Sequence, residues 1–502
     1  MRRLLNNFLT LTYRSLFGAL LITVASCSDF LDEVPDNRVE LDDLDKAGQL
    51  VTNAYSNASY AFTDWMSDNV GFTTGTNLRV SHLEMYNWED VSTGPNEQDT
   101  PDFYWFQTYN AIAHANEVLA TIDDLPAESE EEREQRDAIK GEALLARAYG
   151  HFMLVNLFGE QFGTGSNTGP GVPYITEPET TFIGTYERAS VRRVYDNVEE
   201  DLLDGLDLIS DNFLLNSGKY HFNRNAALAF ASRFYLFKGD FIRCLDFSNQ
   251  LLGSDPSTFV RDLTSEEFRN ASSSIQGYPQ LYSSPNLPSN LMLMRKISLV
   301  QRLDFAFGPD RNFYSDLYGA RPFAGSTDRR ENPAFLKGDN ALFPVRYQNL
   351  FERSSLNSNV GTPYHIAIAF SGEEVLLNRI EANIIQNNLD EAIADLQILT
   401  DGRYDGGETT ITMELLRAFF GAESEPEFTD QLILLNYMLL ERRKEFIAQG
   451  LRWFDIKRYG ISVEHVLRDE ISVIRLAADD PRKVLQIPQS AVEVGGLEPN
   501  PR

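Results

Sequence analysis

The chain is poor in cysteine, with only Cys27 and Cys244 among 502 residues. A disulfide between them is not expected, because Cys27 has a different predicted role that is described below. Packing must therefore supply the stability of the fold. Histidine is scarce too, and its six positions are scattered singly: His82, His114, His151, His221, His365 and His465. We predict no cofactor and single out no metal ligands from this pattern, while the sequence leaves open whether a structural metal ion is bound.

Catalytic motifs are missing. The sequence has no HExxH, GxSxG or Walker A motif, and the glycine-rich stretch 163–169 (GTGSNTG) lacks the lysine and the preceding strand of a phosphate-binding loop. With 74 acidic residues, glycosidase-like pairs of carboxylates occur by chance, so none can be singled out. We predict that the protein is not an enzyme. A surface-anchored glycoside hydrolase is the alternative, and a structural or adhesive surface protein is a third class.

Basic residues are few, with 44 Lys and Arg against 74 Asp and Glu. Residues 1–26 contain three arginines and no acidic residue, so a chain without them carries a net charge of −33. Such a surface repels phosphate backbones, and nucleic acid is excluded as an expected partner. Neutral ligands, or partners with basic patches, fit better. The charge is equally well explained by solubility alone.

Long hydrophobic runs are also lacking, and the apolar run at 16–25 (LFGALLITVA) is too short for a membrane span, which needs about 20 apolar residues. Arg2, Arg3 and Arg14 provide the positive charge of a signal peptide, which we place at residues 1–26. Small residues precede Cys27, as in the lipobox of bacterial lipoproteins, so Cys27 is the predicted lipidation site. An ordinary secretory signal followed by a chance cysteine is the alternative. Residues 27–40 are the predicted lipidated tether.

What the chain does have is apolar material, 42% of its residues, in patterns typical of helices. Amphipathic helices are predicted over 41–57 and 103–122, and a third helix starts near the acidic run at 129–140 and continues to a stop at Gly159. Two segments resemble the tetratricopeptide pattern of paired helices. In the first, Ser232, Tyr235, Gly239 and Cys244 occupy the expected offsets, ahead of Pro256; in the second, Asn387-Asn388 forms the turn before Ala392.

These patterns predict a mainly α fold with a tetratricopeptide-like helical scaffold, at about 41–60, 103–160, 190–256 and 370–460, within a body of residues 41–502. Two loop-rich excursions, at about 61–102 and 257–362, interrupt this scaffold. Long loops on a helical body often carry binding residues.

We expect ligand contacts on these excursions, because they hold aromatic rings that could stack on sugars and polar groups that could bind hydroxyls. Packing of the loops against the body is the alternative for Trp65 and Trp88. The candidate residues are Trp65, Asn77, Arg79, Tyr86 and Trp88 on the first excursion, and Tyr282 and Tyr314 on the second.

The chain resembles the SusD/RagB family of outer-membrane nutrient-binding lipoproteins over its whole length. The opening CSDFLDEVPD at 27–36 and the segments at 109–119, 141–160 and 223–241 are similar to its opening and scaffold helices. The most specific match is ERRKEFIAQGLRWFDIKRYG at 441–460, followed by VLQIPQSAVE and the ending LEPNPR. From the residues alone, this signature is interpreted as structural: Gly450 can cap the preceding helix, and the segment 452–455 docks the last helix on the scaffold.

The resemblance implies a tetratricopeptide-like helical body with a second, largely irregular and loop-rich lobe that carries ligand contacts. It also implies a location in the outer membrane, lipid-anchored and facing the cell exterior. Finally, it implies a partner, a SusC-like TonB-dependent transporter, over which such proteins act as lids and to which they pass oligosaccharides or peptides. Which of these ligands is bound is left open by the sequence.

Overall fold

The structure, a computed structural model, describes residues 41–502 except 92, 164, 180–183, 301, 303, 304, 338, 339 and 470. The predicted signal peptide, the lipidation site Cys27 and the tether lie outside the described residues. Residues 43–502 form one compact unit, to which the elements below belong. Within the described part of the chain, no helix has both the length and the hydropathy that a membrane crossing requires.

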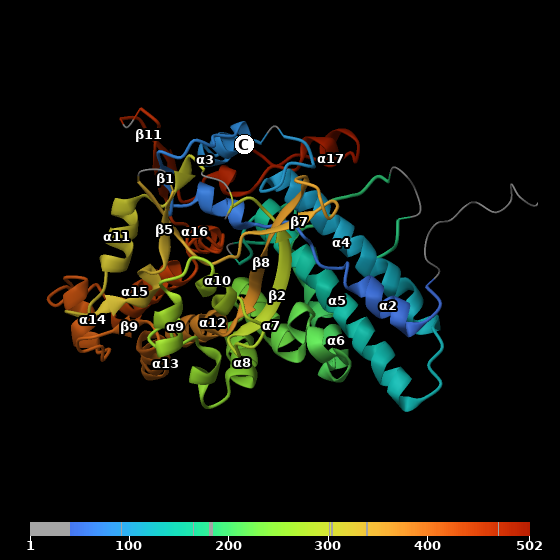
Figure 1. Cartoon of the computed structure of the whole chain (residues 1–502), viewed down its shortest axis with the longest axis horizontal. Coiled ribbons are helices and arrows are strands. Elements are labelled where there is room, and N and C mark those ends of the chain that lie inside the picture. Colours follow the sequence, from blue (N-terminus) through green and yellow to red (C-terminus); the bar gives the residue numbers. More distant parts are fainter. Residues whose placement is uncertain are drawn as a thin grey trace, which may run out of the picture. The chain divides into compact units, whose positions relative to one another are not determined.

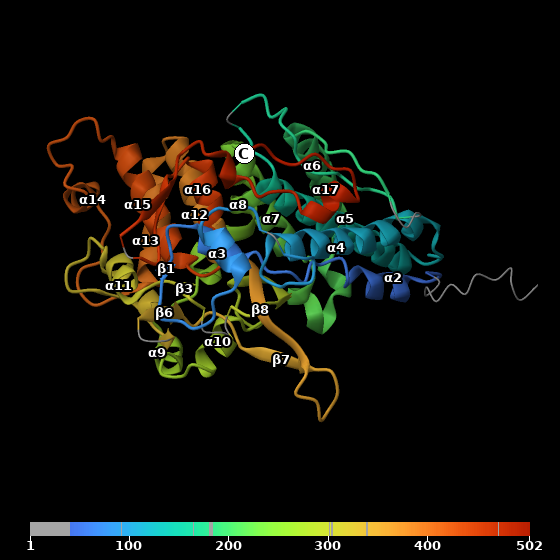
Figure 2. The same cartoon turned by 90° about the horizontal axis from the view of Figure 1, so that it is seen from above.

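Four N-terminal helices begin the scaffold: α2 (Leu44–Val51), α4 (Pro101–Thr121), α5 (Glu130–Phe158) and α6 (Val191–Leu208). Helices α4, α5 and α6 lie side by side (Figures 1 and 2). Helix α5 starts with a capping box, in which the Ser129 hydroxyl accepts from the Glu132 N–H and the Glu132 carboxylate accepts from the Ser129 N–H. It ends before Gly159, so the two longer helix predictions are confirmed. The helix predicted over 41–57 is shorter than expected.

Both predicted helix pairs are present, as α7 (Arg224–Lys238) with α8 (Phe241–Leu252) and α12 (Gly372–Ile385) with α13 (Leu389–Asp401). Gly239 makes the first turn in a left-handed conformation, with φ at 78°, and Ser232 and Ser248 share a 2.9 Å hydrogen bond between the helices. Ala392 is fully buried at the second turn. The chain therefore has the tetratricopeptide-like scaffold that its sequence predicts.

The C-terminal signature forms α15 (Asp430–Glu445) and α16 (Arg452–Arg458). The prediction that Gly450 caps the helix is wrong, because α15 ends at Glu445 and its C-cap is Phe446, four residues before Gly450. Gly450 instead adopts a φ of 81° where a side chain would overlap the Tyr60 carbonyl: an added Cβ would lie 2.6 Å from that oxygen. This glycine is thus required by a turn and a close approach to the first excursion.

Shorter helices and 3-10 turns complete the helical elements. They are η1 (Ala61–Met66), α3 (Val80–Tyr86), η2 (Ile122–Asp124), η3 (Asp211–Phe213), η4 (Leu215–Tyr220), η5 (Pro256–Phe259), α9 (Glu266–Ala271), α10 (Gly277–Tyr282), α11 (Arg311–Gly319), η6 (Arg329–Glu331), α14 (Met413–Phe419), η7 (Pro481–Lys483) and α17 (Gln489–Glu493).

The region between the helix pairs contains strands that the sequence patterns did not predict. An antiparallel sheet has the order β2 (Asn290–Ile297), β8 (Gly361–Ser371), β7 (Leu350–Arg353). Figure 2 shows the β7–β8 hairpin projecting from the body, with Leu356 93% exposed near its tip. Four two-stranded pairs complete the strands: β1 (Gly71–Phe72) with β3 (Phe307–Gly308), β4 (Thr327–Asp328) with β9 (Tyr404–Asp405), β5 (Ala334–Lys337) with β6 (Ala341–Pro344), and β10 (Val463–Val466) with β11 (Val473–Leu476).

A buried charge network joins this second lobe to the scaffold. It consists of four cations and four carboxylates: Arg261, Arg330, Arg403 and Lys444 with Asp328, Glu373, Glu441 and Glu445. At its centre, Arg330 from the second lobe contacts Asp328 at 2.7 Å and Glu441 of α15 at 2.6 Å. Because the charges balance and are all buried, each depends on its partners for stabilisation.

Candidate ligand-binding sites

Two of the predicted binding residues on the first excursion, Trp65 and Tyr86, are buried. The Trp65 ring is 3% exposed and packs on His82, with the ring centroids 4.1 Å apart. Tyr86 is fully buried, and its hydroxyl donates a 2.8 Å hydrogen bond to the carbonyl of Val466. Neither ring offers a face to a ligand in this structure, and both pack the excursion against the body.

The two candidates on the second excursion, Tyr282 and Tyr314, are also internal. The Arg261 guanidinium lies 4.3 Å from the centre of the Tyr282 ring, and the Tyr314 hydroxyl donates to the Glu331 carbonyl at 2.9 Å. Both rings are buried in the second lobe. Their polar and aromatic groups are therefore used in packing.

Asn77 and Arg79 are half-buried and lie just before α3. The Asn77 carbonyl accepts a 3.0 Å hydrogen bond from the Ala306 N–H, and Arg79 lies 3.6 Å from the Glu97 carboxylate. These contacts connect the first excursion to the second and to its own loop. Neither residue lines either of the two cavities described below.

Trp88, by contrast, lines a large groove. Its indole N–H donates to the Met66 carbonyl at 2.8 Å, and its ring stacks on His465. Only 3% of the residue is exposed, so it contributes an edge and not a stacking platform. The packing alternative thus fits Trp88 as well, although it lies at a candidate site.

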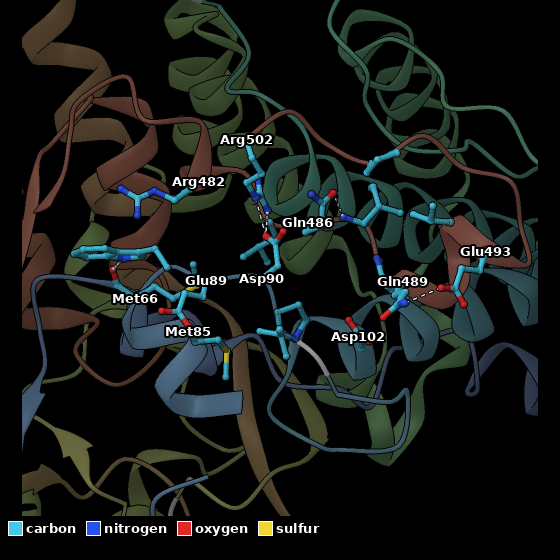
Figure 3. A pocket seen from close by; sticks show the side chains of 18 residues that line it. Met66, Met85, Glu89, Asp90, Asp102, Arg482, Gln486, Gln489, Glu493 and Arg502 are labelled. Carbon is cyan, nitrogen blue, oxygen red and sulfur yellow. Dashed lines mark hydrogen bonds and ion pairs between the residues drawn. The ribbon is translucent and has the colours of Figure 1, made fainter. Parts of the chain in front are cut away.

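That site, here named the C-terminal groove, lies between the first excursion and the last residues of the chain (Figure 3). Its volume is about 450 Å³. One wall comes from residues 66, 85, 88–91 and 101–102, and the other from residues between 482 and 502. The apolar lining consists of Met66, Met85, Val91, Pro101, Leu485, Ile487, Pro488, Val492 and Pro499.

Charged side chains lie among these apolar residues (Figure 3). Arg502 binds Asp90 through two nitrogens, at 2.7 and 2.6 Å, and Arg482 pairs with Asp480 at 2.7 Å. Asp102 has no cationic partner among the described residues, and burial raises the pKa of its carboxyl to about 6. The groove therefore holds its own two cations in ion pairs while one buried carboxylate has none.

A second cavity, here named the amide pocket, has a volume of about 500 Å³ and a different chemistry. It lies between the end of α2, one face of α4, the end of η4 and strand β2. Its polar lining consists of Thr52, Asn53, Tyr55, Asn57, Gln107, Asn110, His114, Tyr220, His221 and Arg295, over a floor of Ala111, Leu293 and Met294.

Several of these polar groups are held in place by partners outside the pocket. Glu142 of α5 accepts a hydrogen bond from Tyr55, and its Oε1 lies 2.8 Å from Nδ1 of His221. The hydrogen bond to this carboxylate raises the pKa of His221. Arg295 is neutralised by Glu352, and it lies over the Tyr364 ring.

Other polar groups in the amide pocket are accessible, since the lining residues Asn53 and Asn110 are exposed. Tyr220 is 39% exposed and can offer part of its ring. Amide side chains both donate and accept hydrogen bonds, so this lining suits a neutral ligand rich in hydroxyl groups. An exposed aromatic ring suits the apolar face of a sugar.

The sequence could not have indicated the amide pocket. Its residues come from segments near positions 52–57, 107–114, 220–221 and 293–295, which only the folded chain brings together. The C-terminal groove could be predicted in part, because its second wall includes residues of the segment 484–493, which resembles the SusD/RagB family. Within the described ranges, no three His, Cys, Asp or Glu side chains are placed to hold a metal ion.

Comparisons with known proteins give a consistent result. The family model described as "Starch-binding associating with outer membrane" matches residues 29–236, and the model described as "SusD family" matches residues 373–492. A SusD-like protein of Formosa agariphila, P38, is 23% identical over 413 residues, which cover 73% of this chain and 74% of that protein.

Solved structures agree with these matches at the level of the fold. A putative sugar-binding protein from Bacteroides vulgatus aligns over 92% of this chain and 99% of its own, with a TM-score of 0.66 and 18% identity. A laminarin-binding SusD-like protein aligns over 91% of this chain and 98% of its own, with a TM-score of 0.57 and 18% identity. Both share the mostly helical architecture described above.

Proposed function

Since the chain belongs to the SusD/RagB family, we propose that it is a cell-surface nutrient-binding protein that captures a neutral oligosaccharide and does not cleave it. The observation that carries this proposal is the amide pocket, whose lining both donates and accepts hydrogen bonds. The family description names starch, and one structural relative is named as laminarin-binding, so glucans are the first ligands to test.

We expect Asn110→Ala and Tyr220→Ala each to weaken binding of a neutral glucan about three- to tenfold. The reason is that each loses one hydrogen bond or one ring contact, worth about 0.5–1.5 kcal/mol. Isothermal titration with maltooligosaccharides and with laminarin oligosaccharides measures this directly. Asn286→Ala is the matched control, because Asn286 is exposed and does not line the pocket.

Undiminished binding in both pocket variants, with folding intact, would remove the amide pocket from consideration. The same samples also test the alternative function. New reducing ends after incubation with either glucan would show a glycoside hydrolase, whereas the proposed binding protein leaves the glucans intact.

The proposal includes a lipid anchor at Cys27 in the outer membrane, with the body facing the cell exterior. Its support is the lipobox-like sequence before Cys27, together with the family match that begins at residue 29. Cys27→Ala is expected to move the protein out of the membrane fraction, because several acyl chains are lost at once. Immunoblots of separated membranes follow this change, and a variant that still fractionates wholly with outer membranes would contradict it.

We further propose that the protein acts as the lid of a SusC-like TonB-dependent transporter and passes its ligand to it. The support is the family membership alone. Affinity purification from the native membrane should recover a large β-barrel protein together with this chain, and recovery of none would count against the lid role.

A further inference from the structure

We propose that the C-terminal groove binds an organic cation, a primary ammonium or guanidinium group on an apolar stem, with Asp102 as its counter-ion. This site is separate from the amide pocket, and the inference does not depend on what that pocket binds. It assigns a charged ligand to a cavity that the neutral-glucan proposal leaves unused.

The first support is the position of Asp102 itself. The residue is only 5% exposed, yet its side chain lines an open groove of about 450 Å³ (Figure 3). No described basic side chain pairs with it, and its first-turn position in α4 provides only partial compensation. A buried carboxylate without a partner is costly, so a cation that enters the groove gains a strong interaction.

The second support is that the groove already holds a guanidinium. Arg502 places its side chain against Asp90 with two close nitrogen–oxygen contacts, at 2.7 and 2.6 Å. The adjacent lining shows how such a group is accommodated, since the methylene stem of a long basic side chain can lie along apolar walls while its head meets a carboxylate. Asp102 is a second carboxylate in the same groove, and no cationic side chain of the described chain pairs with it.

The third support is the apolar lining, which distinguishes an organic cation from a metal ion. Met66, Met85, Leu485 and Ile487 can pack against carbon but cannot ligate a hard cation. Carboxylates in the described part of the chain do not gather into a group of three that could hold a metal. The negative net charge of the chain, −30, adds a long-range attraction for cationic ligands.

Two sources of such a ligand are distinguished by matched pairs of probes. One pair is a short peptide with a lysine and the same peptide with norleucine, which removes only the ammonium group. The other is a glucosamine oligosaccharide and its N-acetylated form. We expect the purified protein to prefer the cationic member of at least one pair by tenfold or more in isothermal titration.

Asp102→Asn is expected to weaken binding of the preferred cation about ten- to hundredfold, as for the loss of a charged hydrogen bond. Glu89→Gln is the matched control: it removes one negative charge from the same groove, and a loss below about threefold is expected there because a less buried charge is better screened. Asp102→Asn should leave glucan binding unchanged, which separates this inference from the proposed function.

Equal binding of the charged and neutral members of both pairs would overturn the inference. So would cation binding that survives in Asp102→Asn with folding intact. Equal losses in Asp102→Asn and Glu89→Gln would also overturn it, because they would show a general effect of charge and not a counter-ion at Asp102.

Discussion

Glu441→Ala is expected to lower the free energy of unfolding by about 3–5 kcal/mol, as for removal of one partner from a buried ion pair. Glu441 is 1% exposed and accepts contacts from Arg330 at 2.6 Å, Lys444 at 3.0 Å and the Tyr404 hydroxyl at 2.7 Å. Without its carboxylate, the network keeps four cations but only three anions. Arg330 and Lys444 then remain in the interior with incomplete neutralisation.

Urea denaturation of the purified protein measures this loss. Glu464→Ala is the matched control, because the Glu464–Arg475 pair lies on the surface and such pairs contribute at most about 1 kcal/mol. A loss from Glu441→Ala no larger than that from Glu464→Ala would show that the network adds little to stability.

The same measurement has a defined pH dependence. Burial raises the pKa of Glu441, but the charges of Arg330 and Lys444 outweigh it and hold the pKa below the ordinary value of 4.5. A carboxyl whose folded pKa is depressed stabilises the fold above its unfolded pKa and ceases to do so as the pH falls through the folded one. The difference between wild type and Glu441→Ala should therefore be full near pH 7 and shrink below about pH 4.5.

Trp453→Ala should lower the free energy of unfolding by about 3–5 kcal/mol, the usual range for truncation of a large buried ring. Trp453 is the second residue of α16, in the C-terminal signature, and is fully buried. Its indole N–H has no hydrogen-bond partner among the described residues, so the ring contributes by packing and not through a polar contact.

Trp453→Phe is the informative comparison, because it keeps most of the ring and removes the unpaired N–H. We expect it to cost clearly less than Trp453→Ala in thermal or urea unfolding. If both substitutions were equally damaging, the cavity left by the ring could not be the cause.

The scaffold could be predicted from the sequence because its signals are local. Helix α5 begins with acidic residues and ends at a glycine, and a glycine also makes the turn between α7 and α8. Each of these residues determines the structure only of its near neighbours in the sequence. The structural interpretation of the C-terminal signature is also supported, since Arg452 pairs with Asp68 at 2.9 Å and Asp455 pairs with Arg442 at 3.2 Å. Those partners themselves could not be predicted, because the first lies more than 350 positions away.

Strands and pockets were harder to predict for a physical reason. Strand β2 is buried along nearly its whole length, so it lacks the alternation of a half-exposed strand and its LMLM core gives no period to detect. The aromatic residues at 65, 86, 282 and 314 were expected to face a ligand because their segments show no helical pattern in the sequence, yet they lie on the short helices η1, α3, α10 and α11. Their rings instead fill the interior of the loop-rich lobe, which needs an apolar core as much as the scaffold does.

Cys244 gives the scaffold an internal reporter. The thiol lies between α8 and α12, 3.9 Å from the Ser232 hydroxyl and 3.8 Å from the Asn378 carbonyl, and burial raises its pKa to about 12. While the helices are packed together, the Cys244 sulfur is neither accessible to alkylating reagents nor deprotonated, so it does not react. Modification of Cys244 therefore requires the helices to separate. The rate of modification measures local opening of the scaffold, and no engineered probe is needed.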